Sequence, residues 1–132
     1  MNTEKNIKTL IVKKPLKLDC GKTINDFPIA YETYGSLNSK KDNAILVFHA
    51  LTGDQFVTGI NPVTNKEGWW SYAVGPDKAI DTNKYFVICS NVIGGCMGSY
   101  GPSHKDPDQK IFGTNFPAVS YTHLTLPTTS TV

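Results

Sequence analysis

The end of an apolar segment at residues 47–53 is the first place in this sequence where residue types and spacing suit catalysis. The segment reads Val-Phe-His-Ala-Leu-Thr-Gly, so a strand-like run is followed at once by a glycine turn. A backbone that turns as it leaves a buried strand exposes amide N–H groups, and such donors stabilise the oxyanion that develops during acyl transfer. The pattern predicts either an oxyanion hole or a plain strand end with a turn at Gly53.

His49 is the titratable side chain at this strand end. A lone His in such a position is typically buried and held by a backbone hydrogen bond, and the alternative is a general base. His104 lies in a polar loop beside Lys105 and Asp106 and is the weaker candidate for a base. Because no second His or carboxylate stands at ligand spacing and no C-x-x-C pair occurs, the sequence predicts no metal site.

Residues 94–98, Gly-Gly-Cys-Met-Gly, fit a thiol version of the G-x-S-x-G nucleophile elbow. An elbow needs a helix directly after the nucleophile, but Gly98, Gly101 and Pro102 would together cost roughly several kcal/mol in a helix. The segment therefore favours a structural glycine loop, with a nucleophilic Cys96 as the alternative. It also lacks the Gly-Lys-Ser/Thr and G-x-G-x-x-G patterns of common phosphate sites.

Two apolar runs must position these loops. Residues 44–48 show no polar alternation, which is typical of a strand covered on both faces, and residues 85–89 repeat the pattern. A long loop rich in Gly, Pro and Asn follows the first run, and a second glycine-rich loop spans residues 91–113. We therefore predict an α/β sheet with parallel buried strands and with its chemistry beyond the strand ends.

The flanking segments are predicted from shorter patterns. Residues 16–19 and 27–34 alternate in polarity and predict an antiparallel hairpin with one face exposed to solvent. The Lys-rich residues 1–22 predict a solvated edge that discourages strand pairing. One helical turn is expected near Trp69 and Trp70. Their aromatic rings are expected to fill the core as part of a lid rather than to form a binding surface for a ligand.

Composition limits the functional classes. The 132 residues suffice for one ordinary domain, and a net charge of +2 is too small to gather nucleic acid or an anionic membrane. No apolar run could cross a bilayer and no signal peptide precedes the domain, which predicts a cytoplasmic protein. Three cysteines without paired spacing predict reduced thiols.

Several ordered blocks resemble the homoserine O-acetyltransferase family. These blocks are residues 30–35 (AYETYG), 49–54 (HALTGD), 68–70 (GWW), 81–91 (DTNKYFVICSN) and 94–99 (GGCMGS). Their order and spacing also agree, and the resemblance extends from about residue 16 to residue 117. It implies an α/β-hydrolase fold and transfer of an acetyl group from acetyl-CoA to the hydroxyl of L-homoserine in methionine biosynthesis.

The resemblance also assigns residues. Family members form an acyl-enzyme on an elbow Ser activated by a His–Asp pair, and two backbone amides bind the oxyanion. One of those amides matches Leu51, and active-site loops match His49, Ala50, Thr52 and Gly53 together with Gly94 and Gly95. Cys96 is then not the nucleophile. Acetyl-CoA is expected as a co-substrate, with no bound cofactor or metal, and the full-length parent is expected to be a homodimer.

The sequence departs from the family in what it lacks. It contains no G-x-S-x-G and no Arg, so we expect residues 1–118 to be the N-terminal part of an α/β-hydrolase domain. In such an incomplete fold the two apolar strands are expected to have an unpaired edge and an uncovered face. Such a fragment is expected to be inactive. Residues 119–132 are expected to be a non-native, disordered tail, because residues 119–124 match the translation of a transposon-end adapter used in DNA library preparation.

Three alternatives remain open at this stage. Relatives in the same family transfer a succinyl group or use serine as acceptor. A cysteine hydrolase of the dienelactone type would use Cys96 and would need a helix after it. A small binding domain using the Trp69–Trp70 surface would need a closed core without an exposed strand edge.

Overall fold

The computed structural model describes residues 7–119 of the chain. They form two compact units, one of residues up to 8 with residues 30–91, and one of residues 9–29 with residues from 92 onward. Each unit is described by itself below. The predicted tail lies outside the described residues except for Val119.

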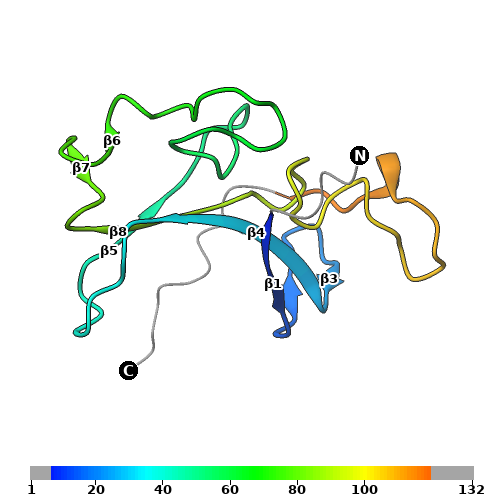
Figure 1. The fold of residues 1–132 in the computed structure, drawn as a ribbon. Helices are drawn as coiled ribbons and strands as arrows, with labels where there is room; N and C mark the ends of the chain where they lie inside the picture. Colours follow the sequence, from blue (N-terminus) through cyan, green and yellow to red (C-terminus); the bar gives the residue numbers. More distant parts are fainter. Residues whose placement is uncertain (1–6, 120–132) are drawn as a thin grey trace. The chain divides into compact units, whose positions relative to one another are not determined.

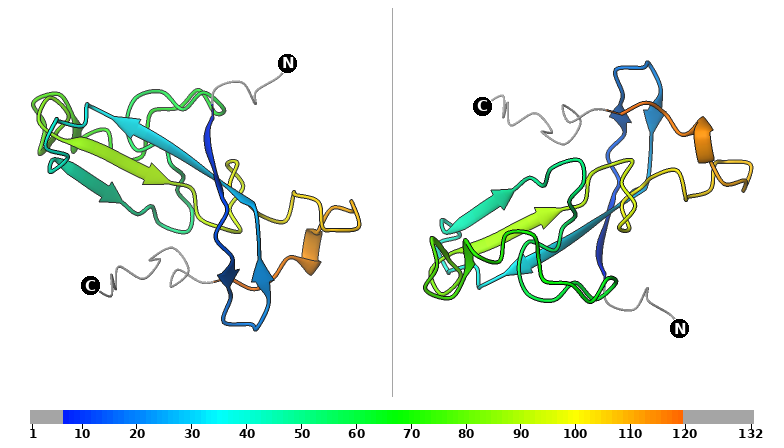
Figure 2. Two further views of the ribbon diagram at one scale, coloured as in Figure 1. Left: turned by 90° about the horizontal axis from the view of Figure 1, so that it is seen from below. Right: turned by 90° about the horizontal axis from the view of Figure 1, so that it is seen from above.

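A four-stranded sheet has the order β1-β4-β8-β5 (Figures 1 and 2). Its strands are β1 (Lys8–Val12), β4 (Phe27–Tyr34), β5 (Ala44–Val47) and β8 (Phe86–Ser90). β8 pairs antiparallel with β4 and parallel with β5. The two predicted apolar strands and their parallel pairing are thereby confirmed, and β1 is a further strand that the Lys-rich sequence did not predict.

Residues 44–48 have the apolar pattern of a strand covered on both faces, but in the described residues they show the uncovered face expected of an incomplete fold. Val47 is buried, but Leu46 is 55% exposed and Phe48 is 47% exposed. Successive side chains of a strand point to opposite faces, so one face packs and the other stays open. In the described part of the chain β5 has β8 as its single hydrogen-bonded neighbour, which leaves the open strand edge expected for an incomplete fold.

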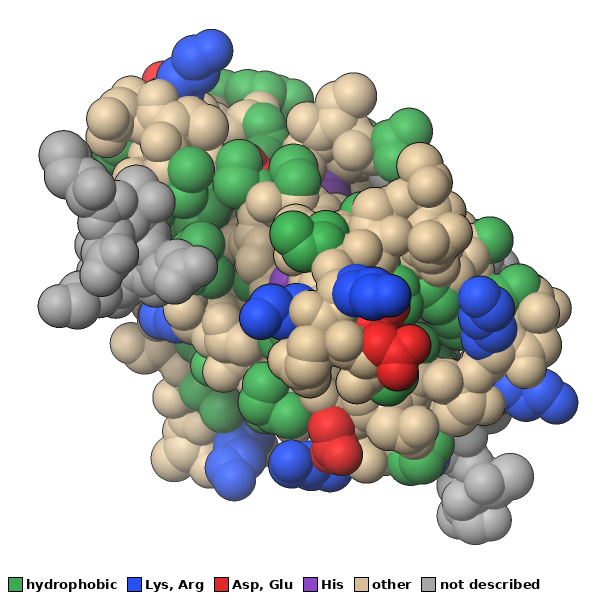
Figure 3. Space-filling model, turned by 90° about the vertical axis from the view of Figure 1, so that its right-hand side faces the viewer, with side chains coloured by type: hydrophobic (Ala, Val, Ile, Leu, Met, Phe, Trp, Pro, Cys, Tyr) green, Lys and Arg blue, Asp and Glu red, His purple; other side chains and the backbone are tan. Residues whose placement is uncertain are grey.

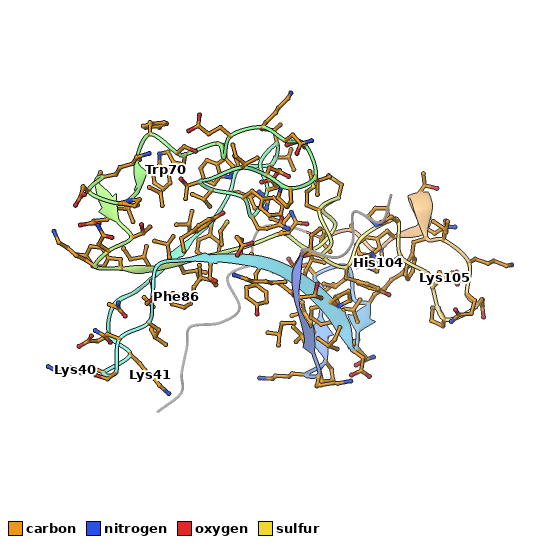
Figure 4. All side chains as sticks on the ribbon, viewed as in Figure 1. Lys40, Lys41, Trp70, Phe86, His104 and Lys105 are labelled. Atoms are coloured by element: carbon orange, nitrogen blue, oxygen red, sulfur yellow. The ribbon has the colours of Figure 1, made fainter. Side chains whose placement is uncertain are left out.

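The core of the first unit lies on the covered face of this sheet. Val47, Val87 and Cys89 of the strands pack with Val57 and Val74 from the loops, and Trp70 is partly buried against them. Val74 belongs to β6 (Val74–Gly75), which forms a short parallel pair with β7 (Ile80–Asp81). Figure 4 shows Trp70 beside this pair, whereas Lys40 and Lys41 project from the tip of the loop between β4 and β5.

The predicted hairpin is wrong in its pairing. β2 (Leu16–Lys17) pairs antiparallel with β3 (Thr23–Ile24) rather than with residues 27–34, which form β4 and pair with β8. The cause is a tight turn in which the Gly21 amide donates to the Leu18 carbonyl at 2.9 Å, with Gly21 at a φ of +84°. The turn returns the chain sooner than the alternation of polarity indicated.

The second unit has a separate small core of Leu18, Ile24, Phe27 and Ile93. Tyr100 and Phe116 pack against it, and their rings meet edge to face with centroids 5.4 Å apart. Val119, the first residue of the predicted tail, is also packed on this core. A single 3-10 turn, η2 (Gly113–Asn115), precedes these last residues.

The surface carries no strong charge pattern on the face drawn in Figure 3. Lys side chains there are distributed among hydrophobic and neutral groups. Within residues 7–119, no helix has the length and apolar character needed to cross a membrane.

Gly35 is expected to be a stability determinant, because its φ of +73° and its surroundings both require glycine. A Cβ there would overlap the Tyr85 carbonyl oxygen and lie 2.6 Å from the Thr82 carbonyl oxygen. Gly59 is a matched control, since it has the same φ of +73° and a Cβ added to it would meet nothing within 4 Å. Urea denaturation should show that Gly59→Ala costs about 1–2 kcal/mol and Gly35→Ala more than about 3 kcal/mol. Equal losses would contradict the close approach.

Candidate functional site: the loop that follows β5

The predicted oxyanion segment forms a tight turn directly beyond β5. The last ladder pair of this strand joins Val47 to Cys89. The Gly53 amide then donates to the Ala50 carbonyl at 2.8 Å, which closes a turn with Leu51 and Thr52 at its centre. The turn therefore lies at the carboxyl end of a parallel strand, where α/β proteins place their ligands.

The Leu51 amide is outside the ladder and faces away from the turn. Within residues 7–119 its nitrogen has no hydrogen-bond acceptor, and the Leu51 side chain is 80% exposed. The Ala50–Leu51 peptide is planar and trans, so its N–H points opposite to the carbonyl that the turn engages. A free backbone N–H in this position can donate to an oxyanion, but its assignment to an oxyanion hole stays a prediction.

His49 is buried, as expected for a His at a strand end. The residue is only 2% exposed, and its ring Nδ1 lies 2.7 Å from the Ala50 carbonyl oxygen. On the other side of the ring, Nε2 lies 3.4 Å from Nδ2 of Asn91. Both ring nitrogens have protein partners, which favours a structural role over that of a general base.

Two residues of this region were missed by sequence reasoning. Asn91 directly follows β8, is 1% exposed and reaches the His49 ring. Asp54 accepts the Phe56 amide at 2.8 Å and the Asn61 side-chain amide at 3.0 Å. The sequence contained a usable signal for each residue. Asn91 lies at the end of a predicted strand, and Asp54 is of a residue type that forms Asx turns with the amide two residues later.

The tryptophan pair is divided between two environments. The rings of Trp69 and Trp70 stack with centroids 5.7 Å apart. Trp70 packs against the core, whereas Trp69 is 39% exposed and donates from Nε1 to the Asp54 carbonyl at 2.9 Å. The expectation of a core plug holds for Trp70 and is wrong for Trp69, which stacks on Trp70 and leaves part of its ring exposed.

The glycine loop of the second unit has no elbow geometry. Gly94 has a φ of +85°, and its amide donates to the Tyr100 carbonyl at 2.7 Å, while the Gly95 amide donates to Val92. Bends and turns, not a helix, follow Cys96. The cysteine-hydrolase alternative is therefore wrong, and the assignment of Gly94 and Gly95 to an active-site loop stays a prediction.

Other candidate groups carry no catalytic arrangement. His104 lies in the second unit, where Nδ1 accepts the Gly101 amide at 3.2 Å and the ring lies 5.3 Å from that of Tyr100 (Figure 4). In the part of the chain that the structure describes, no three His, Cys, Asp or Glu side chains are grouped so as to hold a metal ion.

The sequence matches curated relatives along most of its length. It is 73% identical over 121 residues to a homoserine O-acetyltransferase of Pelagibacter ubique, a match that covers 91% of this chain and 32% of the relative. It is 54% identical over 114 residues to a homoserine O-acetyltransferase of Methanococcus vannielii, covering 86% of this chain and 23% of the relative. The chain thus spans about a third or less of these relatives. No protein-family model matches it.

Solved structures agree with the fold. A homoserine O-acetyltransferase from Bacillus anthracis aligns with a TM-score of 0.79 at 30% identity, covering 90% of this chain and 34% of that one. Esterase E22 aligns with a TM-score of 0.77 at 28% identity, covering 89% and 34%. The predicted incomplete α/β-hydrolase fold is confirmed.

The three thiols are expected to differ in reactivity. Burial, reinforced by the nearby Asp54 charge, raises the pKa of Cys89 to about 12, whereas Cys20 and Cys96 are exposed. The thiolate is the reactive form, so a disulfide reagent at pH 8 should modify Cys20 and Cys96 quickly and Cys89 only after unfolding in guanidinium. Rapid reaction of all three thiols in the native chain would contradict the buried position of Cys89.

Tyr34 is expected to make stability fall at alkaline pH. Its hydroxyl accepts the Val57 amide at 3.0 Å and donates to the Gln55 carbonyl at 3.3 Å, and burial raises its pKa to about 12 from 10.0. A raised folded-state pKa stabilises the protein below the unfolded value and loses that effect as pH rises through the folded value. The free energy of unfolding should therefore decrease between about pH 10 and pH 12.

The variant Tyr34→Phe tests whether Tyr34 causes the loss of stability at alkaline pH. At pH 7 the variant should lose about 0.5–1.5 kcal/mol, because the Val57 amide and the Gln55 carbonyl each lose one hydrogen bond. The two groups keep the bond of 3.1 Å that joins them to each other. The alkaline decrease of the variant should be shallower than that of the unaltered chain. The remainder is due to Cys89 and Tyr100, because burial raises the pKa of both groups as well. Urea denaturation at several pH values measures both effects, and parallel pH profiles would refute the role of Tyr34.

Proposed function

We propose that this chain, which belongs to the homoserine O-acetyltransferase family, forms part of an enzyme that transfers an acetyl group from acetyl-CoA to the hydroxyl of L-homoserine. The observation that carries the proposal is the Leu51 amide. It lies beyond the end of β5, is free of protein acceptors among residues 7–119 and belongs to a turn at the carboxyl end of a parallel strand. In an acyltransferase it is one donor of the oxyanion hole.

The Leu51 N–H acts when charge develops on the carbonyl oxygen of the acetyl group. An elbow Ser outside these 132 residues attacks the thioester, a His takes its proton, and the tetrahedral oxyanion accepts the Leu51 N–H. The oxyanion collapses, the CoA sulfur leaves with that proton, and the acetyl group remains on the Ser. The His then takes the proton of the homoserine hydroxyl as that hydroxyl attacks the ester, and a second oxyanion forms at the same donor. Its collapse releases O-acetylhomoserine, and the Ser oxygen leaves with the proton from the His.

The substrates, the pathway and the oligomeric state in this proposal rest on different grounds. The homoserine acceptor and the acetyl donor follow the names of the similar proteins, so succinyl transfer and serine acetylation are the less supported alternatives. Acetyl-CoA is a co-substrate in this mechanism, with no bound cofactor. Placement of the reaction in methionine biosynthesis and a homodimeric parent rest on the family resemblance alone.

The decisive experiment uses a complete enzyme that contains this segment. In a chimera, residues 7–118 of the chain replace the matching segment of the Pelagibacter ubique relative, and CoA release is measured with acetyl-CoA and L-homoserine. Leu51→Pro removes the N–H at a turn position that tolerates proline, so kcat should fall about 10²- to 10³-fold. Leu51→Ala keeps the N–H and should lose far less.

Two outcomes would contradict the proposal. Similar rates for the proline and alanine variants would show that the Leu51 amide does not serve the transition state. Preference of the chimera for succinyl-CoA or for serine would replace the proposed substrates. The 132-residue chain alone is expected to release no CoA, since G-x-S-x-G is absent from its sequence.

A further inference from the structure

We propose that His49 is a positioning residue that fixes the direction of the Leu51 N–H by holding the carbonyl of Ala50. The inference rests on the proposed oxyanion role of Leu51 and assigns no contact with substrate to His49. Its basis is a small hydrogen-bond arrangement within the first unit, formed by His49, Ala50, Gly53 and Asn91.

The Ala50 carbonyl oxygen has two donors. His49 Nδ1 lies 2.7 Å from it, and the Gly53 amide nitrogen lies 2.8 Å from it. A carbonyl oxygen has two lone pairs, so both can be used at once. One donor comes from the side chain preceding the turn and the other from the backbone at its end, and together they restrict rotation of the Ala50–Leu51 peptide.

This restriction determines where the Leu51 N–H points. The peptide unit is planar and trans, so its N–H and C=O are antiparallel. When Ala50 O is held toward the His49 ring and the inside of the turn, the Leu51 N–H is directed to the opposite side, where Leu51 is exposed. Oxyanion stabilisation depends on donors that are already oriented, because reorientation during the reaction would cost part of their effect.

The His49 ring is itself held in one tautomer. A carbonyl oxygen can only accept, so Nδ1 must carry a hydrogen. In the neutral ring Nε2 is then an acceptor, which matches the Asn91 Nδ2 donor 3.4 Å away. Because His49 is 2% exposed and Asn91 is 1% exposed, water competes little for these bonds. Asn91 thus selects the tautomer that His49 needs to hold Ala50.

The absence of a side chain at Gly53 leaves room for this arrangement. A Cβ at residue 53 would lie 3.1 Å from His49 Cβ and 3.3 Å from the Ala50 oxygen. Both distances are tighter than ordinary van der Waals contact, so a methyl group would push on the same ring and the same carbonyl. The lack of a side chain at residue 53 therefore leaves space for the His49 ring and the Ala50 carbonyl.

The test compares two His49 variants in the chimeric enzyme. Asn places its side-chain nitrogen near the position of Nδ1 and keeps a donor for Ala50, whereas Leu has similar bulk and no donor. Both variants lose the bond from Asn91, so a purely structural role of that contact would affect them alike. His49→Leu should lower kcat and kcat/KM by the same factor, about 10- to 100-fold, with KM unchanged. His49→Asn should recover kcat to within about 3-fold of the parent.

A second readout follows the tautomer directly. In the chimera labelled with ¹⁵N-histidine, two-bond proton–nitrogen correlations should identify His49 as the neutral form protonated on Nδ1. A ring protonated on Nε2 alone would overturn the inference, as would equal kcat values for the Leu and Asn variants.

The two proposals fail in distinguishable ways. If Leu51→Pro is harmless, the oxyanion role of Leu51 is lost and the inference falls with it. If Leu51→Pro lowers kcat as expected while His49→Leu leaves it unchanged, the oxyanion role stands and the positioning role of His49 is refuted. Gly53→Ala should resemble His49→Leu, with a reduced kcat and an unchanged KM.

Discussion

The parallel pairing of β5 with β8 is the constraint on which the candidate site depends. The register that joins Val47 to Cys89 ends both strands at the same edge of the sheet. Residues two positions beyond these partners are therefore neighbours, and the contact between the His49 ring and Asn91 follows from the register. A slip of β5 by one residue would turn Val47 out of the core and separate His49 from Asn91.

In the proposed oxyanion role of Leu51, the chemistry resides in the backbone. An amide N–H is present at every position except proline, so under this proposal the Leu51 side chain carries little of the catalytic information. The direction of this N–H depends on its neighbours: β5 ends at Val47, the Gly53 amide closes the turn onto the Ala50 carbonyl, and the His49 ring bonds to the same carbonyl. Side-chain exposure of 80% at Leu51 fits this division, since the side chain does not fill the core.

The sequence predicted the parts of the fold that follow local pattern. The two apolar runs were identified as parallel strands to within a residue at each end, and the turn after β5 was expected from Gly53. The pairing of β2 was not predicted correctly. Alternation in polarity identifies a strand but not its partner, and the tight turn at Gly21 pairs β2 with β3. Asn91 was missed for a related reason. Its role depends on a residue 42 positions earlier in the chain, which only the sheet register brings near.

The exposure of β5 connects the fold with the length of the chain. A segment as apolar as Ala-Ile-Leu-Val-Phe is typical of a strand with protein on both faces, yet Leu46 and Phe48 are about half exposed in the described residues. Their sequence is thus adapted to more cover than residues 7–119 provide. Because the chain spans 32% of its Pelagibacter ubique relative, a protein of that length has ample further chain to cover this face and to pair with the free edge of β5.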